Sequence, residues 1–251
     1  MSHAAKPALV IPDTHQNIDW VEAILVKESA EVSQVVFLGD YLDAKVKTAD
    51  TPEATARYIA NLQSRYPELP ITFLVGNHDL PYLYDLQNDR SPESTNPNPY
   101  SNGAYVPAYS EQVREHFNHD FLSQLKPFAL VEGFLMSHAG LHIAHFPVQT
   151  DDALQTLYTE LNQHISKLPD QRPPALAAVG IARRGLDPIG GLAWQDWFHE
   201  FEDSLPWPQI VGHTLLDEPD SRGRSWNLDT RNGSYALIQN ATIQIRALPK
   251  E

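Results

Sequence analysis

Cysteine is absent from this sequence of 251 residues. The absence excludes disulfide frameworks, thiol nucleophiles and zinc sites built from thiolates. Basic residues are scarce as well, because 18 Lys and Arg stand against 32 Asp and Glu, a net charge of −14. That sign disfavours non-specific binding to nucleic acids or anionic membranes, which are themselves polyanions. An acidic chain can still bind phosphate where a metal ion supplies positive charge.

Long apolar runs are also missing. No stretch reaches the roughly 20 apolar residues of a membrane-spanning helix, and the run at residues 8–11 is too short for the core of a signal peptide. We therefore expect no membrane association and a cytoplasmic location. With 42% hydrophobic residues, a chain of this length can bury its own core, so we expect a single domain over residues 1–251.

Three short β-branched runs, at residues 8–11, 35–38 and 71–75, each end abruptly in polar residues. Such runs are typical of buried strands that lead into loops. The segments between them, 20–31 and 52–66, have a helical composition and are long enough to be crossover connections. The pattern predicts a parallel βαβαβ sheet in an α/β fold.

The rest of the chain predicts an insertion and more elements. Residues 85–110 are rich in Pro, Asn and Ser, which predicts a long inserted loop of the kind that often carries function. Helices are expected at 111–125 and 151–167, with a short one inside 190–203. Strands are expected in pairs or triplets, namely two within 128–137 and three within 225–248, the latter with tight turns at Asn232-Gly233 and at Asn240.

Five polar blocks follow the apolar runs in order. They are Asp13-Thr-His15, Gly39-Asp40-Tyr-Leu-Asp43, Gly76-Asn77-His78-Asp79, Ser137-His138-Ala-Gly140 and Gly212-His213-Thr214. Residues at the carboxyl ends of neighbouring strands can converge on one spot outside the sheet, where α/β folds bind ligands. Carboxylate, imidazole and amide groups without sulfur suit Mn²⁺, Fe, Zn²⁺ or Mg²⁺. The blocks therefore predict a divalent metal site.

Taken together, the blocks resemble those of the calcineurin-like metallophosphoesterases, whose pattern is DxH, GDxxD, GNH[DE], a His before small residues, and GH. The resemblance runs from Asp13 to His213. It implies a four-layer α/β fold, a double β-sandwich flanked by helices. Leu215 stands where many phosphodiesterases of the superfamily have the second His of GHxH. The pattern is therefore nearer to serine/threonine protein phosphatases and dinucleoside-tetraphosphate hydrolases.

The resemblance also implies a role for each block. One Asp would bridge two divalent ions, most simply Mn²⁺, with Fe, Zn²⁺ and Mg²⁺ also compatible. A bridging hydroxide would then attack the phosphorus of a phosphate monoester. Taken singly, the Asp and Asn residues could be mere turn or cap residues, but caps do not require histidines at matched strand ends. The implied ligands are Asp13 and His15 for the first metal, Asp40 as the bridge, and Asn77, His138 and His213 for the second.

His78 is implied to be the general acid, paired with Asp43. A carboxylate at imidazole Nδ1 fixes the tautomer and keeps the other nitrogen protonated, ready for the leaving oxygen. For Asp43 the alternative is simple compensation of a helix dipole in a first turn. Asp79, the neighbour of His78, is expected to be structural.

The usual phosphate-binding arginines of the family are missing. Ala44 follows GDxxD and Gln195 follows Leu192-Ala-Trp194, at positions where relatives often carry Arg. We expect Arg183 or Arg184 to bind the substrate phosphate instead, because a guanidinium pairs with two phosphate oxygens at once. The alternative is a solvated pair. Tyrosines of the insertion, Tyr100, Tyr105 or Tyr109, are expected to shape the leaving-group side.

Substrates implied by this interpretation are a phosphorylated small molecule, a nucleotide or a phosphoprotein. The runner-up reaction is hydrolysis of a phosphoanhydride in a dinucleoside polyphosphate or other nucleotide. A non-enzymatic alternative is a catalytically idle, metal-stabilised binding module that docks a partner through the 85–110 loop. Retention of His78 and Asp43 favours the enzyme, because an idle relative is expected to lose one of them.

Overall fold

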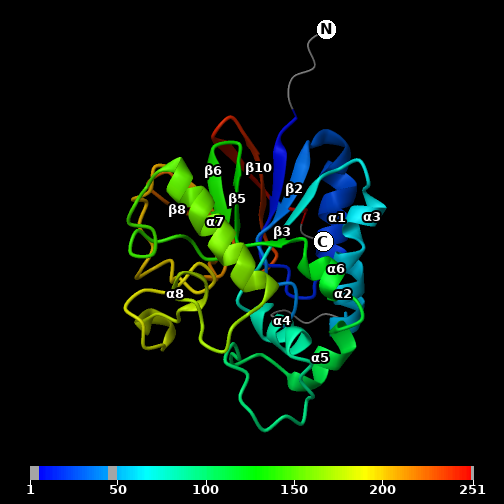
Figure 1. Cartoon of the computed structure of the whole chain (residues 1–251). Coiled ribbons are helices and arrows are strands. Elements are labelled where there is room, and N and C mark those ends of the chain that lie inside the picture. Colours follow the sequence, from blue (N-terminus) through cyan, green and yellow to red (C-terminus); the bar gives the residue numbers. More distant parts are fainter. Residues whose placement is uncertain (1–5, 45–49, 250–251) are drawn as a thin grey trace.

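The computed structural model describes residues 6–44 and 50–249. Two β-sheets pack face to face, with helices outside them (Figure 1). This arrangement confirms the expected α/β double sandwich flanked by helices. The outermost ends of the expected 1–251 domain, 1–5 and 250–251, lie outside the described residues, as does the segment 45–49. Among the described residues, no helix combines the length and apolarity needed to cross a membrane.

The first sheet contains the predicted βαβαβ unit. Its core strands β1 (Ala8–Ile11), β2 (Gln34–Phe37) and β3 (Ile71–Leu74) are parallel neighbours. The connections are α1 (Ile18–Glu28) with the short η1 (Ser29–Glu31), then α2 (Pro52–Ala60) and α3 (Leu62–Arg65). The edges are β4 (Leu125–Lys126) beside β3, and the hairpin β10 (Tyr235–Gln239) and β11 (Thr242–Arg246) beside β1.

The second sheet begins with the predicted hairpin of β5 (Phe128–Val131) and β6 (Phe134–Ser137). Next to β6 lies β7 (Gln209–Val211), which is parallel to it. The sheet is completed by β9 (Ser225–Asn227) and β8 (Asp220–Arg222). Helix α7 (Asp151–Ser166) confirms the helix expected at 151–167 and begins at the side-chain cap of Thr150.

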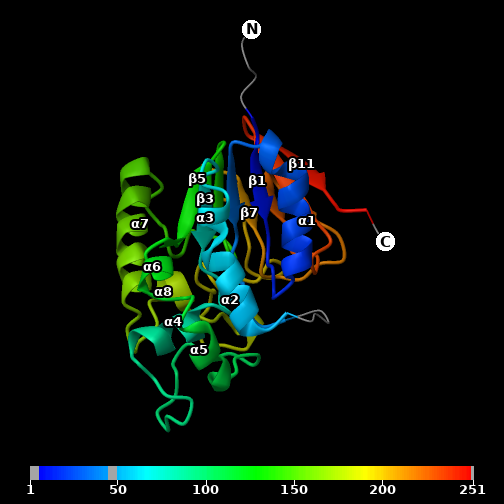
Figure 2. The same ribbon diagram turned by 90° about the vertical axis from the view of Figure 1, so that its right-hand side faces the viewer.

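The core has two layers because strand residues alternate between faces. In β1, Ala8 and Val10 join the cluster that seals the two sheets against each other, whereas Leu9 and Ile11 join the cluster under the helices. Figure 2 shows α7 outside one sheet and α1 outside the other. Both faces of β1 are therefore covered by apolar residues, and the polar residues Asp13 and His15 come only after the strand ends.

The insertion is shorter than expected. Helix α4 (Leu80–Gln87) enters the predicted 85–110 segment and α5 (Pro107–Val113) leaves it, so the irregular part is 88–106. Pro107 belongs to the segment expected to be a loop, but it stands in the first turn of α5, where a missing N–H costs nothing; Pro81 has the same place in α4. The single helix expected at 111–125 is wrong, because Asn118 caps a new short helix, α6 (His119–Leu122).

Two further expectations about local structure are wrong. Residues 190–203 form turns rather than a helix, because the Glu200 carboxylate accepts the backbone N–H groups of Gly190 and Asp196. The turn at Asn232-Gly233 does not close a hairpin, since β9 and β10 belong to different sheets. That turn therefore carries the chain from one sheet to the other. The turn at Asn240 does join β10 to β11. Two short helical segments, α8 (Pro174–Ala177) and η2 (Ile181–Arg183), precede the irregular stretch.

Candidate functional site

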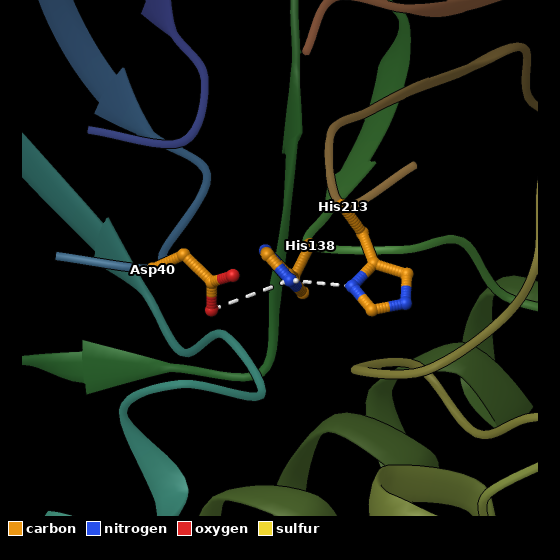
Figure 3. A group of neighbouring side chains, drawn as sticks. All are labelled: Asp40, His138 and His213. Atoms are coloured by element: carbon orange, nitrogen blue, oxygen red, sulfur yellow. Dashed lines mark hydrogen bonds and ion pairs between the residues drawn. The ribbon is translucent and has the colours of Figure 1, made fainter. Parts of the chain in front are cut away.

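The five polar blocks converge at the shared edge of the two sheets. Residues that offer ligand atoms within 4.8 Å of one another form two groups, which we call the Asp13 half (Asp13, His15 and Asp40) and the His213 half (Asp40, His138 and His213). Asp40 belongs to both halves. Figure 3 shows His138 between Asp40 and His213. The structure therefore brings together the predicted metal ligands, and the shared carboxylate is the one expected to bridge two ions.

Glycines allow the loops to approach so closely. A Cβ atom on Gly76 would lie 2.2 Å from Asp40 Oδ1, and a Cβ atom on Gly212 would lie 2.0 Å from Asp13 Oδ1. Any side chain at either position would displace a carboxylate of the site. The glycines before Asn77 and His213 are therefore part of the motif for a steric reason.

Two histidines of the site, His15 and His138, are held in the tautomer that a metal ligand needs. A carbonyl oxygen only accepts hydrogen bonds, so the contacts of His15 Nδ1 with Leu42 O and of His138 Nδ1 with Leu38 O, both 3.0 Å, are donated by Nδ1–H. Each ring then presents the lone pair of Nε2 to the site. Burial lowers the pKa of His138 to about 3, which keeps this imidazole neutral.

Asn77 completes the His213 half. Its Oδ1 lies 2.9 Å from His138 Nε2 and 2.8 Å from His213 Nδ1, and these two nitrogens are 3.2 Å apart. His138 Nε2 also lies 3.4 Å from Asp40 Oδ1. Oxygen and nitrogen donors crowded around one point are the arrangement expected for a divalent ion.

The charge of the Asp13 half also fits a cation. Asp13 is 1% exposed, and among the described residues no lysine or arginine pairs with its carboxylate. Burial raises the pKa of Asp13 well above its usual value, because the charge is removed from water, and the nearby carboxylate of Asp229 adds to the effect. A bound cation would offset that cost. The donor set therefore fits the metal ions expected from the sequence.

Asp79 is a structural residue, as expected. Its carboxylate accepts the backbone N–H groups of Asp40 and Tyr41 at 2.9 Å and that of Gly76 at 2.8 Å. It thereby locks the loop after β2 to the loop after β3. Burial raises the pKa of Asp79 to about 7, against the opposing effect of these three donors.

His78 lies beside the predicted metal ligands but forms a separate pair. Its Nδ1 is 2.7 Å from Asp43 Oδ2, whereas its Nε2 is 4.0 Å from Asp40 Oδ2. The Asp43 Oδ1 atom accepts a hydrogen bond of 2.5 Å from the hydroxyl of Tyr82. Burial and the neighbouring Asp43 raise the pKa of Tyr82, so the phenol stays a donor. The structure thus forms the expected His78–Asp43 pair and adds Tyr82 to it.

A cavity of about 570 Å³ opens above the ligands, and His15, Asp40, Asn77, His78 and His213 line it. We call three of its lining stretches the rim segments. They are residues 102–104, Arg183, and residues 231–232. Trp194 and Leu215 also contribute to the wall.

The expected arginines behave differently from each other. Arg183 lines the cavity, and its guanidinium contacts Asp196 Oδ2 at 2.9 Å and the Thr214 hydroxyl. Arg184 is not among the described residues that line the cavity. The expected tyrosines do not line it either. Tyr100 donates to Pro169 O and Tyr105 to Asp85, so they fasten the insertion to the body of the protein.

Several residues of the site carry no recognisable pattern in the sequence. Asn102 donates to Asn77 O at 3.2 Å, which holds the insertion against a predicted metal ligand. Arg231 and Asn232 enter the cavity from the connection between the sheets. The only signal in the sequence was the pair Asn232-Gly233, which was interpreted as a hairpin turn.

The two sheets and the donors gathered at their edge define the class, an α/β protein with a candidate metal site. Comparison of the sequence with protein families matches the calcineurin-like phosphoesterases over residues 6–237. The chain therefore belongs to the calcineurin-like phosphoesterase family and is a metal-dependent phosphoester hydrolase. A comparison with curated protein sequences finds no match.

Solved structures share the fold at low sequence identity. A cold-active protein-tyrosine phosphatase of the psychrophile Shewanella sp. is 16% identical, with a TM-score of 0.61 over 96% of this chain and 80% of that one. A putative diadenosine tetraphosphatase is 16% identical, with a TM-score of 0.51 over 98% and 96%. A protein serine/threonine phosphatase from Saccharomyces cerevisiae is 14% identical, with a TM-score of 0.52 over 100% and 82%. At these identities the likeness shows the fold alone.

Proposed function

We propose that this chain hydrolyses phosphate monoesters with two divalent metal ions, Mn²⁺ being the first candidate. The observation that carries the proposal is the sharing of Asp40 between the two halves of the ligand cluster (Asp13, His15, Asp40, Asn77, His138 and His213). When bound, such a pair of ions lowers the pKa of a coordinated water and stabilises charge on phosphoryl oxygens. The chain itself supplies the ligands, a proton donor and a phosphate-binding cation.

His78 is the proposed general acid. Its Nδ1–H donates to Asp43 at 2.7 Å, which fixes the ring. His78 also lines the cavity, so its Nε2 is the nitrogen left for the substrate. A proton on Nε2 is thus placed to be given to the leaving oxygen as the P–O bond breaks. Because Tyr82 occupies the second oxygen of Asp43, the carboxylate has one orientation toward the imidazole.

Arg183 is the proposed phosphate-binding residue of the predicted pair. Asp196 and the Thr214 hydroxyl hold its guanidinium, and Thr214 directly follows the ligand His213. An arginine fixed in this way can bind a phosphoryl oxygen with little loss of side-chain entropy. Arg183 would therefore take over from the arginines missing at Ala44 and Gln195.

The proposal is tested by metal analysis of the purified chain, followed by a hydrolysis panel with added Mn²⁺. The panel contains a phosphomonoester, a phosphodiester, a dinucleoside tetraphosphate and a phosphopeptide. We expect two metal ions per chain and fastest turnover of a monoester. Preference for the tetraphosphate would replace the proposal by the phosphoanhydride reaction, and full metal loading without any hydrolysis would identify an idle binding module.

A further inference from the structure

Arg231 lies next to the Asp13 half of the ligand cluster. The adjacent residue, Asn232, donates through Nδ2 to Asp13 O at 2.9 Å and to Thr14 O at 3.3 Å. Its Oδ1 accepts a hydrogen bond from Asn17 Nδ2 at 3.2 Å. The connection between β9 and β10 is therefore fastened to the loop that carries the first metal ligands, and Arg231 lines the same cavity.

Arg183 approaches the other half. It is held by Thr214, which follows His213, and by Asp196. The two arginines of the cavity therefore stand beside different halves of the ligand cluster. An elongated substrate that places its phosphoryl group against the metal ligands can meet both.

The backbone at Arg231 is in an unfavourable conformation for its residue type. Arg231 has φ 54° and Asn232 has φ 62°, both in the left-handed region. Asn adopts this region readily, but an arginine has a Cβ atom that clashes there and no short polar group to compensate. Hydrogen bonds of Asn232 and the contact of Arg231 N with Asp229 Oδ1, 3.2 Å, hold the turn in place. Strain of this kind persists only where surrounding contacts hold the backbone, and it is frequent at functional sites.

The guanidinium of Arg231 also has no partner among the described residues. The residue is exposed at the cavity, and its guanidinium forms no hydrogen bond or ion pair with any part of the chain that the structure describes. Arg183, by contrast, uses part of its guanidinium for Asp196 and Thr214. The N–H groups of Arg231 therefore remain available to an anion.

The cavity has room for more than a phosphoryl group. Its volume of about 570 Å³ falls within the roughly 300–1,000 Å³ of sites that enclose whole small molecules. The protein has a net charge of −14, so the guanidinium of Arg231 at the cavity is not part of a general basic surface. It can therefore select for an anionic group.

We propose that Arg231 is a specificity-determining residue that binds a second anionic group of the substrate, separate from the phosphoryl group that reacts. This assignment rests on the proposed phosphoesterase function. A carboxylate and a second phosphate share the chemistry that the guanidinium recognises. The preferred substrates are therefore monoesters that carry one of these groups a few bonds from the reacting phosphate.

The test compares three probes that share one phosphorylated carbon, namely glycerol 3-phosphate, 3-phosphoglycerate and glycerol 1,3-bisphosphate. Their inhibition constants are measured against hydrolysis of 4-nitrophenyl phosphate by the metal-loaded full chain. We expect the two probes that carry a second anionic group, 3-phosphoglycerate and glycerol 1,3-bisphosphate, to bind more tightly than glycerol 3-phosphate. Arg231→Ala should reduce that preference about 10-fold or more, the effect of one charge-assisted hydrogen bond. The carboxylate and bisphosphate arms show which anion is favoured.

Control variants separate binding from folding. Arg231→Gly should lose the preference as Arg231→Ala does, while its melting temperature equals or exceeds that of the parent chain, because Gly tolerates the left-handed turn. Ala241→Gly relieves a left-handed residue (φ 56°) in the β10–β11 turn, and Arg57→Ala removes a charge from α2. Both should keep the preference. Arg231→Lys should restore only part of it, since an ammonium cannot form the paired contact.

Each outcome decides the assignment. If Arg231→Ala weakens all three probes equally, Arg231 binds the reacting phosphoryl group and the assignment is overturned. A lower melting temperature for Arg231→Gly with unchanged preference would make the residue structural. If the parent chain fails to hydrolyse 4-nitrophenyl phosphate, the proposed function fails and the assignment with it. Hydrolysis with no preference among the probes overturns the assignment alone.

Discussion

The ligand cluster and the rim segments are built in opposite ways around one cavity. In the ligand cluster, Asp13 and Asp40 are 1% exposed and His138 is fully buried. In the rim segments, Arg231 is exposed and Arg183 is only partly buried. The proposed ligands follow closely on buried strands, whereas the rim residues lie in connections between elements: Asn102 in the insertion, Arg183 at the end of η2, and Arg231 between β9 and β10. The difference separates chemistry, which the sheets fix, from recognition, which the loops can change without disturbing the sheets.

The two regions also differ in how hydrogen bonds hold them. The ligand cluster is held by carboxylates that accept backbone N–H groups: Asp79 accepts three, and Asp13 accepts that of His213. The rim segments are held by neutral amide side chains that donate to backbone carbonyls: Asn102 to Asn77 O and Asn232 to Asp13 O. Changes in the ligand cluster should therefore abolish turnover, and changes in the rim segments should redistribute it among substrates.

The largest effect is expected for Asp40→Asn. The substitution weakens the one carboxylate that both halves share, so metal analysis should show loss of both ions. Catalytic efficiency should fall by more than the roughly 10⁴-fold that losing a general acid can cost. Asp152→Asn, in the first turn of α7, is the control and should keep both ions. Full metal content and turnover in Asp40→Asn would contradict the bridging role.

His78→Asn tests chemistry beside the ligands without removing one. We expect unchanged metal content and a fall in turnover of about 10²- to 10⁴-fold on an alkyl phosphate, the range for a lost general acid. The fall should be smaller on 4-nitrophenyl phosphate, whose leaving group needs little protonation. His164→Asn on α7 serves as the matched control. Equal losses on both substrates, or loss of metal, would speak against the acid role.

Arg183→Ala moves the comparison to the rim. Removing one charge-assisted hydrogen bond to phosphate, about 1.5 to 3 kcal/mol, should lower kcat/KM by roughly 10- to 150-fold without loss of metal. Because Arg184 does not line the cavity, Arg184→Ala should have the smaller effect. Thermal melting checks that loss of the Arg183–Asp196 ion pair has not destabilised the fold. If the variant with both Arg183→Ala and Arg184→Ala has the same kcat/KM as the parent chain, the metals and His78 bind the phosphate without either arginine.

Tyr82→Phe should have the smallest effect, because Tyr82 acts through Asp43. Loss of a hydrogen bond of about 1 kcal/mol should lower turnover of an alkyl phosphate by about 3- to 10-fold. The loss should shrink on 4-nitrophenyl phosphate and vanish in a His78→Asn background, as a double-mutant cycle would measure. Tyr158→Phe on α7 is the control. A full additional loss in the His78→Asn background would mean that Tyr82 supports the fold instead.

The sequence predicted the ligand cluster better than the rim segments for a physical reason. Each ligand follows a short apolar strand, a local pattern, and parallel strands bring such residues to one edge. Tyr82 was missed because its partner Asp43 is 39 residues away. Arg231 was missed because its place depends on the contact of Asn232 with Asp13, 219 residues away.

The same distinction explains the errors in secondary structure. The strands at 8–11, 35–38 and 71–75 were predicted because their apolar character is continuous. The segment 190–203 has a helical composition in part, but the carboxylates of Glu200 and Asp196 accept its backbone N–H groups and replace the helical bonds. Such side-chain contacts compete with the helix and leave no periodic trace in the sequence.

The residues of the His213 half, together with Asn77, come from both sheets. Asp40 and Asn77 follow strands of the first sheet, and His138 and His213 follow strands of the second. An ion bound by these four residues would connect the two sheets where their strands end, as a covalent cross-link would. Its binding free energy then becomes resistance to shearing of the sandwich, growing with the logarithm of the free ion concentration. The ion would therefore be a structural fastener as well as a reagent, and a chelator should lower the melting temperature.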